Sequence, residues 1–270
     1  MDRIKKALDK SRSQKRTRLL QQVEVPAGGE TESYHPFEHI DYTRTRRIEV
    51  PQSVLSENRL IAGNRTDPRA TSFRMLRTQV LQLMRENEWN TLGITGPSKG
   101  IGKSLVATNL AISISHEVNQ TVLLVDVDLR RPSIHRYFNF EPELGLLDYL
   151  QGEARVEDLL VNPEFKRLVL LPGRGTTTES SELLSSPRMI NLVKELKSRY
   201  QSRIIVFDMP PLLDIDDAIV FLPNVDSTLL VVENGRNTQS EVQKSMRLLG
   251  STNLIGSVLN KADEELQDYY

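Results

Sequence analysis

Residues 91–104 read TLGITGPSKGIGKS, an apolar strand pattern that runs into a glycine-rich turn and a lysine-serine pair. This order is typical of a P-loop, in which backbone N–H groups, a lysine and a hydroxyl together surround phosphate oxygens. Gly100 and Gly102 allow the backbone to approach a phosphate closely, and the helix that follows adds its positive N-terminus. Pro97 stands where the usual pattern has its first glycine. The stretch therefore predicts a P-loop NTPase with a deviant Walker A motif.

The same loop predicts which residues hold ATP and Mg²⁺. We expect Lys103 to reach the β- and γ-phosphates and the Ser104 hydroxyl to bind the metal. The expected nucleotide-binding set from this loop is Gly100, Ile101, Gly102, Lys103, Ser104 and Leu105. Because a Gly-Lys-Ser triplet before a helix is common, the prediction also depends on acids at neighbouring strand ends.

Two aspartates follow a second apolar run. Asp126 and Asp128 come directly after residues 121–125. In an extended segment this alternation points both carboxylates to the same side. There they can share the metal and accept a proton from an incoming hydroxyl. The alternative is that one of them caps a helix or pairs with Arg130 or Arg131.

A third acid, Asp208, follows the apolar residues 204–207. This is the context of a Walker B acid, whose carboxylate holds Mg²⁺ directly or through water. Ligands bind at the C-terminal ends of the strands in an open parallel sheet. We therefore expect the P-loop and both acidic loops to converge on one pocket for a triphosphate. The expected metal ligands are Ser104, Asp128 and Asp208.

Strand and helix patterns alternate along most of the chain. The expected helices cover residues 70–85, 103–116, 146–150, 156–160, 187–199, 215–221 and 239–249. The expected strands cover residues 91–95, 121–125, 168–171, 204–207, 228–232 and 254–259. Such alternation predicts an α/β fold, with a mostly parallel sheet flanked by helices on both faces.

Composition restricts the classes of function. The 270 residues carry a net charge of −1, which argues against a nucleic-acid partner. The chain has no cysteine, which excludes thiolate metal sites and cysteine catalysis. Apolar runs are too short to cross a bilayer, and the start of the chain lacks the apolar core of a signal peptide. We therefore expect a cytoplasmic protein.

The chain divides into three parts by composition. Residues 1–66 are expected to be a flexible basic N-terminal helix and linker, residues 67–262 the P-loop domain, and residues 263–270 an acidic tail that bears tyrosines. The first 20 residues carry eight lysines and arginines against two aspartates. They predict either an amphipathic helix that docks on a partner or an anionic membrane surface, or a solvated tail.

The motifs resemble those of bacterial tyrosine kinases over residues 70–261. Residues 126–130, DVDLR, look like the Walker A′ motif of that family, and residues 208–211, DMPP, look like its Walker B loop. Further matching segments are Asp217-Ala218 and residues 73–78 and 181–187. The basic opening of the chain is similar to that of the soluble autokinases encoded in exopolysaccharide loci.

This resemblance implies an ATP-dependent protein-tyrosine autokinase that uses Mg²⁺. Such proteins regulate exopolysaccharide or capsule synthesis and chain length, and they phosphorylate C-terminal tyrosines in trans. The implied partners are a membrane-embedded polysaccharide co-polymerase that acts as activator and further copies of the chain in a homo-oligomer. The implied location is the cytoplasm, with peripheral contact at the inner face of the membrane.

The resemblance also assigns roles to individual residues. Lys103 matches the catalytic P-loop lysine, Asp126 a candidate base or metal ligand with Asp128 as its neighbour, and Asp208 the Walker B acid. Arg74 and Arg77 match an oligomerisation helix, Asn260 resembles a contact to the nucleotide base, and Tyr269 and Tyr270 match phosphate acceptors.

Two other functions remain open from the sequence. The first is a partition- or septum-positioning-type ATPase, a class with a signature lysine five residues before the P-loop lysine. Here that position is Ser98, and Lys99 lies one residue out of register. The second is a nucleotide-gated, non-catalytic scaffold of polysaccharide assembly.

Overall fold

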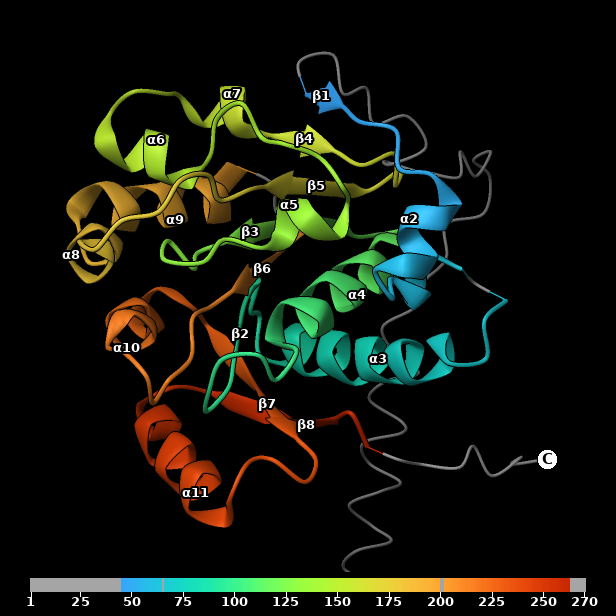
Figure 1. The fold of residues 1–270 in the computed structure, drawn as a ribbon, viewed down its shortest axis with the longest axis vertical. Helices are drawn as coiled ribbons and strands as arrows, with labels where there is room; N and C mark the ends of the chain where they lie inside the picture. The colour runs from blue at the N-terminus through green and yellow to red at the C-terminus, as the bar shows by residue number, and fades with distance from the viewer. Residues whose placement is uncertain (1–44, 65, 200–201, 263–270) are drawn as a thin grey trace, which may run out of the picture. The chain divides into compact units, whose positions relative to one another are not determined.

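The computed structural model describes residues 45–64, 66–199 and 202–262, all of which belong to one compact unit. Its centre is an eight-stranded sheet with the order β1-β4-β5-β3-β6-β2-β7-β8, which runs from top to bottom in Figure 1. The strands are β1 (Arg46–Arg47), β2 (Thr91–Thr95), β3 (Thr121–Asp126), β4 (Val161–Asn162), β5 (Leu168–Leu171), β6 (Arg203–Asp208), β7 (Ser227–Glu233) and β8 (Leu254–Asn260). All neighbouring strands pair in parallel except β4 and β5. The predicted α/β fold with a mostly parallel sheet is confirmed.

Helices cover both faces of this sheet. The α-helices are α2 (Gln52–Glu57), α3 (Ala70–Glu86), α4 (Lys103–Ser115), α5 (Ile134–Tyr137), α6 (Leu146–Gln151), α7 (Val156–Leu159), α8 (Ser180–Leu184), α9 (Pro187–Arg199), α10 (Asp217–Phe221) and α11 (Gln239–Leu248). Short 3-10 helices are η1 (Ile61–Gly63), η2 (Leu222–Asn224) and η3 (Leu249–Ser251). No helix among the described residues is long and apolar enough to span a membrane.

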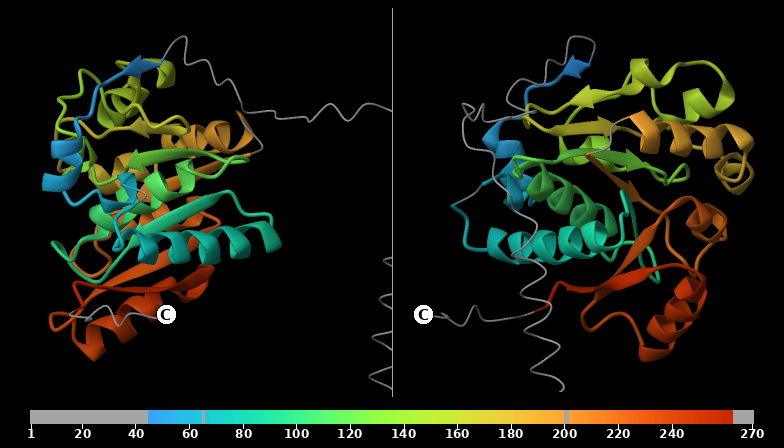
Figure 2. Two further views of the ribbon diagram at one scale, coloured as in Figure 1. Left: turned by 90° about the vertical axis from the view of Figure 1, so that its right-hand side faces the viewer. Right: turned by 180° about the vertical axis from the view of Figure 1, so that it is seen from behind.

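Helices lie on both faces of the sheet in the side view of Figure 2. Alternation along the strands produces two separate hydrophobic cores. On β3, Leu124 packs with α3 and α4, whereas the next residue, Val125, packs with α9 and α10. On β6, Val206 and Phe207 divide in the same way. Both faces are buried, which explains why these strands read as continuous apolar runs in the sequence.

The register of the central strands brings the acidic loops level with the P-loop. Asp126 at the end of β3 pairs with Asp208 at the end of β6, and Asp208 also pairs with Ile94 on β2. The P-loop begins two residues after Ile94. Three turns that are far apart in the sequence therefore emerge side by side at one edge of the sheet.

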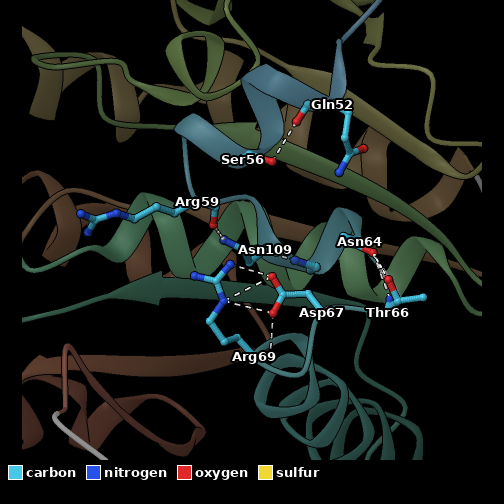
Figure 3. Close-up of polar contacts among 9 residues, drawn as sticks. Gln52, Ser56, Arg59, Asn64, Thr66, Asp67, Arg69 and Asn109 are labelled. Carbon is cyan, nitrogen blue, oxygen red and sulfur yellow. Dashed lines mark hydrogen bonds and ion pairs between the residues drawn. The ribbon is translucent and has the colours of Figure 1, made fainter.

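The fold begins upstream of the boundary expected from composition. Residues 21–66 read as linker in the sequence, but residues 46–63 form β1, α2 and η1. Leu60 and Ala62 are buried in the core shared with α4. The buried Asn109 of α4 accepts a hydrogen bond from the Ala62 N–H (3.0 Å) and donates one to the Arg59 carbonyl (3.1 Å) (Figure 3). The expected basic N-terminal helix lies outside the described residues.

If residues 46–63 belong to the folded unit, Leu60→Ala should lower the free energy of unfolding by ~2–5 kcal/mol, the usual cost of a buried Leu-to-Ala cavity. Leu60 is 1% exposed. Leu259→Ala is the matched control, because that side chain is 59% exposed and its loss should cost less than ~0.5 kcal/mol. Equal, small changes in urea denaturation would contradict the packing.

Candidate active site

The P-loop joins β2 to α4 and has two residues in the left-handed region. Gly100 has a φ of 77° and Gly102 a φ of 91°, which favour glycine at both positions. A Cβ atom on Gly102 would lie 2.1 Å from the Asn260 side-chain nitrogen. This turn places Lys103 at the start of α4, with the helix N-terminus facing the loop.

A pocket of about 460 Å³ opens at this loop. It is lined by Lys99, Gly100, Gly102, Lys103, Ser104, Asp128, Arg131, Ser133, Tyr137 and Arg236. The expected site residues among these are Gly100, Gly102, Lys103, Ser104 and Asp128. The sequence did not predict that Arg131, Ser133, Tyr137 and Arg236 line the pocket. The adjacent Arg130 and Arg131 and the polar loop after β7 are the features of the sequence that could have indicated it.

The other expected nucleotide-binding residues do not line the pocket. The Ile101 side chain is fully buried in the core, and Leu105 is partly buried against it. Asn260, expected as a base contact, donates a hydrogen bond to the Ile101 carbonyl (2.8 Å). In this structure its contact is therefore to the P-loop backbone.

Lys103 is a buried cation at the inner end of the pocket. Its side chain is 7% exposed, and its ammonium group donates a long hydrogen bond to the Ser98 carbonyl (3.4 Å). Burial lowers the pKa of Lys103, while the nearby carboxylates of Asp208 and Asp128 oppose that shift. No ion pair within 4 Å joins this ammonium group to Asp208 or Asp128 among the described residues, which leaves its donors available for phosphate oxygens.

Asp126 organises the loop that follows β3. It is fully buried, and its carboxylate accepts hydrogen bonds from the N–H groups of Asp128 (3.2 Å), Ser133 (2.8 Å) and Ile134 (3.0 Å). Burial raises the pKa of Asp126 to about 7, against the lowering effect of these hydrogen bonds. Asp126 thereby fixes the path of the backbone that carries the pocket-lining residues Asp128, Ser133 and Tyr137.

Asp208 is buried, and neither carboxylate oxygen has a hydrogen-bond partner of acceptable geometry among the described residues. Burial raises the pKa of Asp208 well above its usual value, and the neighbouring Asp126 raises it further. The Ser104 hydroxyl is close enough to lower this pKa, although it does not meet hydrogen-bond geometry. An orphaned buried carboxylate next to the P-loop serine is a donor set that fits a cation.

The donor set fits Mg²⁺ in particular. No group of three acidic or histidine side chains that could enclose a metal occurs in the described residues. Mg²⁺ does not need such a group, because it commonly takes one or two protein oxygens and completes its shell with water and substrate phosphates. Ser104 and Asp208, with Asp128 on the pocket wall, would be sufficient to hold it.

Arg130 has a structural partner rather than a place in the pocket. Its guanidinium binds both carboxylate oxygens of the fully buried Asp217 on α10, at 2.9 and 3.3 Å. The Ser180 hydroxyl of α8 also donates to Asp217. Neither Asp126 nor Asp128 pairs with Arg130, but the Asp128 carboxylate accepts a hydrogen bond from the Arg131 N–H (2.9 Å), so the expected alternative holds in part for Asp128. These contacts join the loop after β3 to α8 and α10.

Hydrogen bonds connect the loop after β6 to the end of β2 and the start of the P-loop. The Thr95 hydroxyl donates to the Pro210 carbonyl (2.8 Å). In return, the N–H of Leu212 donates to the Gly96 carbonyl (2.9 Å), and the N–H of Leu213 donates to the Pro97 carbonyl (3.1 Å). The Walker B loop and the start of the P-loop are thus fixed against each other.

Glu233 at the end of β7 holds two cations against the backbone of the P-loop. Its carboxylate pairs with Arg236 (3.1 Å) and Lys261 (3.0 Å). Arg236 donates to the Lys99 carbonyl (2.9 Å) and Lys261 to the Gly100 carbonyl (3.1 Å). Because these cations occupy the two carbonyls, the arrangement favours a loop whose N–H groups are left to face the phosphates.

We expect Glu233→Gln to raise the KM for ATP by roughly three- to tenfold, because partly exposed ion pairs make modest contributions. The kcat should change less, since the reacting groups remain in place. Glu195→Gln, which breaks the Arg199 ion pair on α9, is the matched control and should leave the KM for ATP unchanged. Steady-state kinetics with varied ATP checks this, and a drop in kcat alone would contradict the role.

The two arginines expected to mediate oligomerisation lie on α3. Arg74 is exposed, and its guanidinium donates to the Thr71 hydroxyl (2.6 Å). Arg77 is largely buried, donating to the Ser113 carbonyl (3.1 Å) and pairing with Glu117 (3.0 Å). In this single chain Arg77 therefore stabilises the packing of α3 on α4. The acceptor candidates Tyr269 and Tyr270 lie outside the described residues.

Known proteins with similar sequences are tyrosine kinases. An AAA-domain family model matches residues 92–256. The tyrosine-protein kinase etk of Escherichia coli K12 is 34% identical over 74% of this chain, which spans 28% of that protein. The protein CapB of Staphylococcus aureus is 30% identical over 73% of this chain and 87% of its own length. The chain thus spans between about a quarter and a third of the length of the larger relatives.

Solved structures give the same result. The kinase domain of the Escherichia coli tyrosine kinase ETK superposes with a TM-score of 0.69 at 31% identity, covering 83% of this chain and 91% of that domain. The septum site-determining protein MinD from Pyrococcus horikoshii, solved with Mg-ADP, is more distant, with a TM-score of 0.54 and 25% identity over 63% of this chain and 69% of its own. From its P-loop, its acidic loops and these matches, the chain belongs to the bacterial tyrosine kinase family.

Proposed function

We propose that this chain is an ATP-dependent protein-tyrosine kinase that phosphorylates the C-terminal tyrosines of neighbouring copies. One observation carries the proposal: Lys103 and Ser104 line a pocket large enough for a nucleotide, and the buried carboxylate of Asp208 lies beside Ser104. This arrangement provides a cation for phosphate oxygens and a carboxylate for a metal. Both are needed for phosphoryl transfer, in which catalysis consists mainly of positioning and charge stabilisation.

The residues divide the work as follows. Lys103 and the N–H groups of residues 100–104 bind the β- and γ-phosphates. Ser104 and Asp208, with Asp128, would hold Mg²⁺, which would neutralise the charge of the transferred phosphoryl group. Asp128 lines the pocket and accepts the proton of the tyrosine hydroxyl. The tyrosine oxygen then bonds to the γ-phosphorus, and the bond from that phosphorus to the β-phosphate oxygen breaks, which releases ADP. Asp126 positions Asp128 by binding its N–H group.

Substrates and partners follow from the family resemblance. The acceptors are Tyr269 and Tyr270, which a neighbouring copy receives in its pocket, so the active form is a homo-oligomer in which Arg74 and Arg77 lie at the contact. The activator is a membrane-embedded polysaccharide co-polymerase, and the basic N-terminus contributes peripheral contact with the membrane. The biological output is control of exopolysaccharide or capsule synthesis.

The deciding experiment incubates the purified full-length chain with Mg-ATP and measures phosphotyrosine by mass spectrometry. We expect modification of Tyr269 or Tyr270, and loss of the signal when EDTA removes the metal. The double variant Tyr269→Phe with Tyr270→Phe should lose it as well. Phosphotyrosine that persists in that variant would remove the tail from the proposal.

The other outcomes distinguish the alternatives. Release of phosphate from ATP without any phosphotyrosine would favour the partition-type ATPase, to which the MinD similarity extends at the level of the fold. Against that class, Ser98 occupies the position of the signature lysine, and its carbonyl accepts from Lys103. Nucleotide binding with neither product would favour the scaffold.

A further inference from the structure

We propose that Lys99 and Arg131 form a docking surface at the mouth of the pocket for the acidic acceptor segment, residues 263–268, of another copy of this chain. This inference rests on the proposed function, and it adds the way in which the acceptor is recognised. Its starting point is a difference among the four cations that line the pocket, which are Lys99, Lys103, Arg131 and Arg236.

Two of these cations are already engaged within the chain. Arg236 pairs with Glu233 and donates to the Lys99 carbonyl, and Lys103 is buried beside Asp208 and Asp128. Lys99 and Arg131 differ, because both side chains are exposed and neither has a hydrogen bond or ion pair in the part of the chain that the structure describes. They come from different loops, after β2 and β3, yet they line the same pocket.

The segment before the tyrosines has the complementary charge. Residues 262–270 read ADEELQDYY, with four acidic residues and no lysine or arginine. Asp268 directly precedes Tyr269, and Asp263, Glu264 and Glu265 follow the end of the described chain. The carboxylates of such a segment are repelled by the phosphates of bound ATP and by the acidic residues of the site, unless cations at the entrance balance their charge.

The spacing suits an extended acceptor. Successive residues of an extended chain advance ~3.3 Å and point to opposite sides. When the hydroxyl of Tyr270 lies in the pocket, the side chain of Asp268, two residues earlier, points to the same side and lies ~7 Å away along the chain, near the pocket entrance. Arg131 can bind such a carboxylate with two parallel hydrogen bonds, and Lys99 provides a second, mobile charge.

The test separates recognition of the acceptor from recognition of ATP. The acceptor is the full-length Lys103→Met chain, with either its native tail or a tail neutralised by Asp263→Asn, Glu264→Gln, Glu265→Gln and Asp268→Asn. The enzyme carries Tyr269→Phe and Tyr270→Phe, so that all new phosphotyrosine is on the acceptor. We expect neutralisation to raise the acceptor KM by roughly tenfold at low salt, as for the loss of one to two charge-assisted contacts. The KM for ATP should stay within about twofold.

Variants of the enzyme provide the second arm. Lys99→Gln and Arg131→Gln should each raise the acceptor KM, and the difference between native and neutralised tails should disappear in the double variant. Lys194→Gln, an exposed lysine on α9, is the control for total charge. Melting temperature reports whether each variant is folded.

Three results overturn the inference, and one of them also overturns the function. Equal acceptor KM values for the native and neutralised tails show that the acidic flank is not read. A rise in the KM for ATP without a rise for the acceptor shows that Lys99 and Arg131 bind nucleotide. If no enzyme variant, including the parent, forms phosphotyrosine on the native acceptor, the kinase proposal itself fails.

Discussion

Replacing Lys103 with methionine should reduce phosphotyrosine formation by at least ~10²–10³-fold, because the loss of one preorganised charge at a phosphoryl-transfer site has effects of this size. The ammonium group is the deepest cation in the pocket and lies near the carboxylates of Asp208 and Asp128. Without it, triphosphate oxygens approach two acids and no buried positive charge. Methionine fills the space of the aliphatic stem, so the backbone of α4 should not move.

The measurement is the initial rate of phosphotyrosine formation, together with the affinity for ATP from titration calorimetry. Lys194→Met is the matched control, since it removes an exposed lysine on α9 far from the P-loop in sequence. Both variants should melt within a few degrees of the parent. A Lys103→Met enzyme that retains a tenth of the parent rate would show that the phosphates are bound elsewhere.

Replacing Asp208 with asparagine should have opposite effects on activity and stability. Activity should fall by ~10²-fold or more, because a metal ligand is lost. The ligand-free fold should become more stable by about 1–2 kcal/mol, or by about 2–8 °C in melting temperature. The reason is that a buried carboxylate, which has no hydrogen bond of acceptable geometry among the described residues, is replaced by a neutral group of the same shape.

The raised pKa values also predict how the free energy of unfolding changes with pH. Burial raises the pKa of Asp208 and that of Asp126, the latter to about 7, so the fold retains protons that the unfolded chain has already released. This stabilisation is complete below the ordinary carboxyl pKa and is lost as pH rises through the pKa in the fold, which is about 7 for Asp126. Each such group contributes a slope of at most about 1.4 kcal/mol per pH unit. The unfolding free energy should therefore fall from pH 5 to pH 7, and less steeply in Asp208→Asn.

Asp216→Asn is the control for both measurements, because that aspartate is exposed and directly precedes α10 as its N-cap residue, a position that asparagine suits equally well. It should change neither the melting temperature nor its pH dependence. A destabilised Asp208→Asn protein at pH 8 would mean that the carboxylate has stabilising partners in solution, and the metal assignment would lose its physical basis.

The sequence predicted the central sheet and the convergence of its loops well. The apolar runs identified the strands, and the aspartates at their ends meet because β3 and β6 are parallel neighbours in the sheet. The predicted limits of β5 (Leu168–Leu171) and α9 (Pro187–Arg199) match the observed ones. The tight turn of the P-loop was also predictable, because Gly100 and Gly102 adopt positive φ angles that favour glycine.

The remaining features depend on tertiary contacts that no local pattern records. Residues 46–63 lack a long apolar face, and they are held by single anchors such as Leu60 and by Asn109 from another helix. Sequence alternation placed Asp126 and Asp128 together, but it could not show that backbone N–H groups occupy Asp126. Likewise, Glu233 and Arg236 carry no motif, and their role arises only because β7 lies next to β2 in the sheet.

The hydrogen bonds between the P-loop and its neighbouring loops limit how nucleotide can be exchanged. Bonds from Leu212, Leu213 and Arg236 hold the loop from two directions. Residues 131–137 form one wall of the pocket, and among the described residues they make no hydrogen bond to the P-loop. The N–H groups of Ser133 and Ile134 donate to Asp126 instead. The exit route for spent ADP should therefore open on that side. Amide exchange in residues 131–137 should slow when nucleotide is present, while the P-loop behaves as a fixed floor.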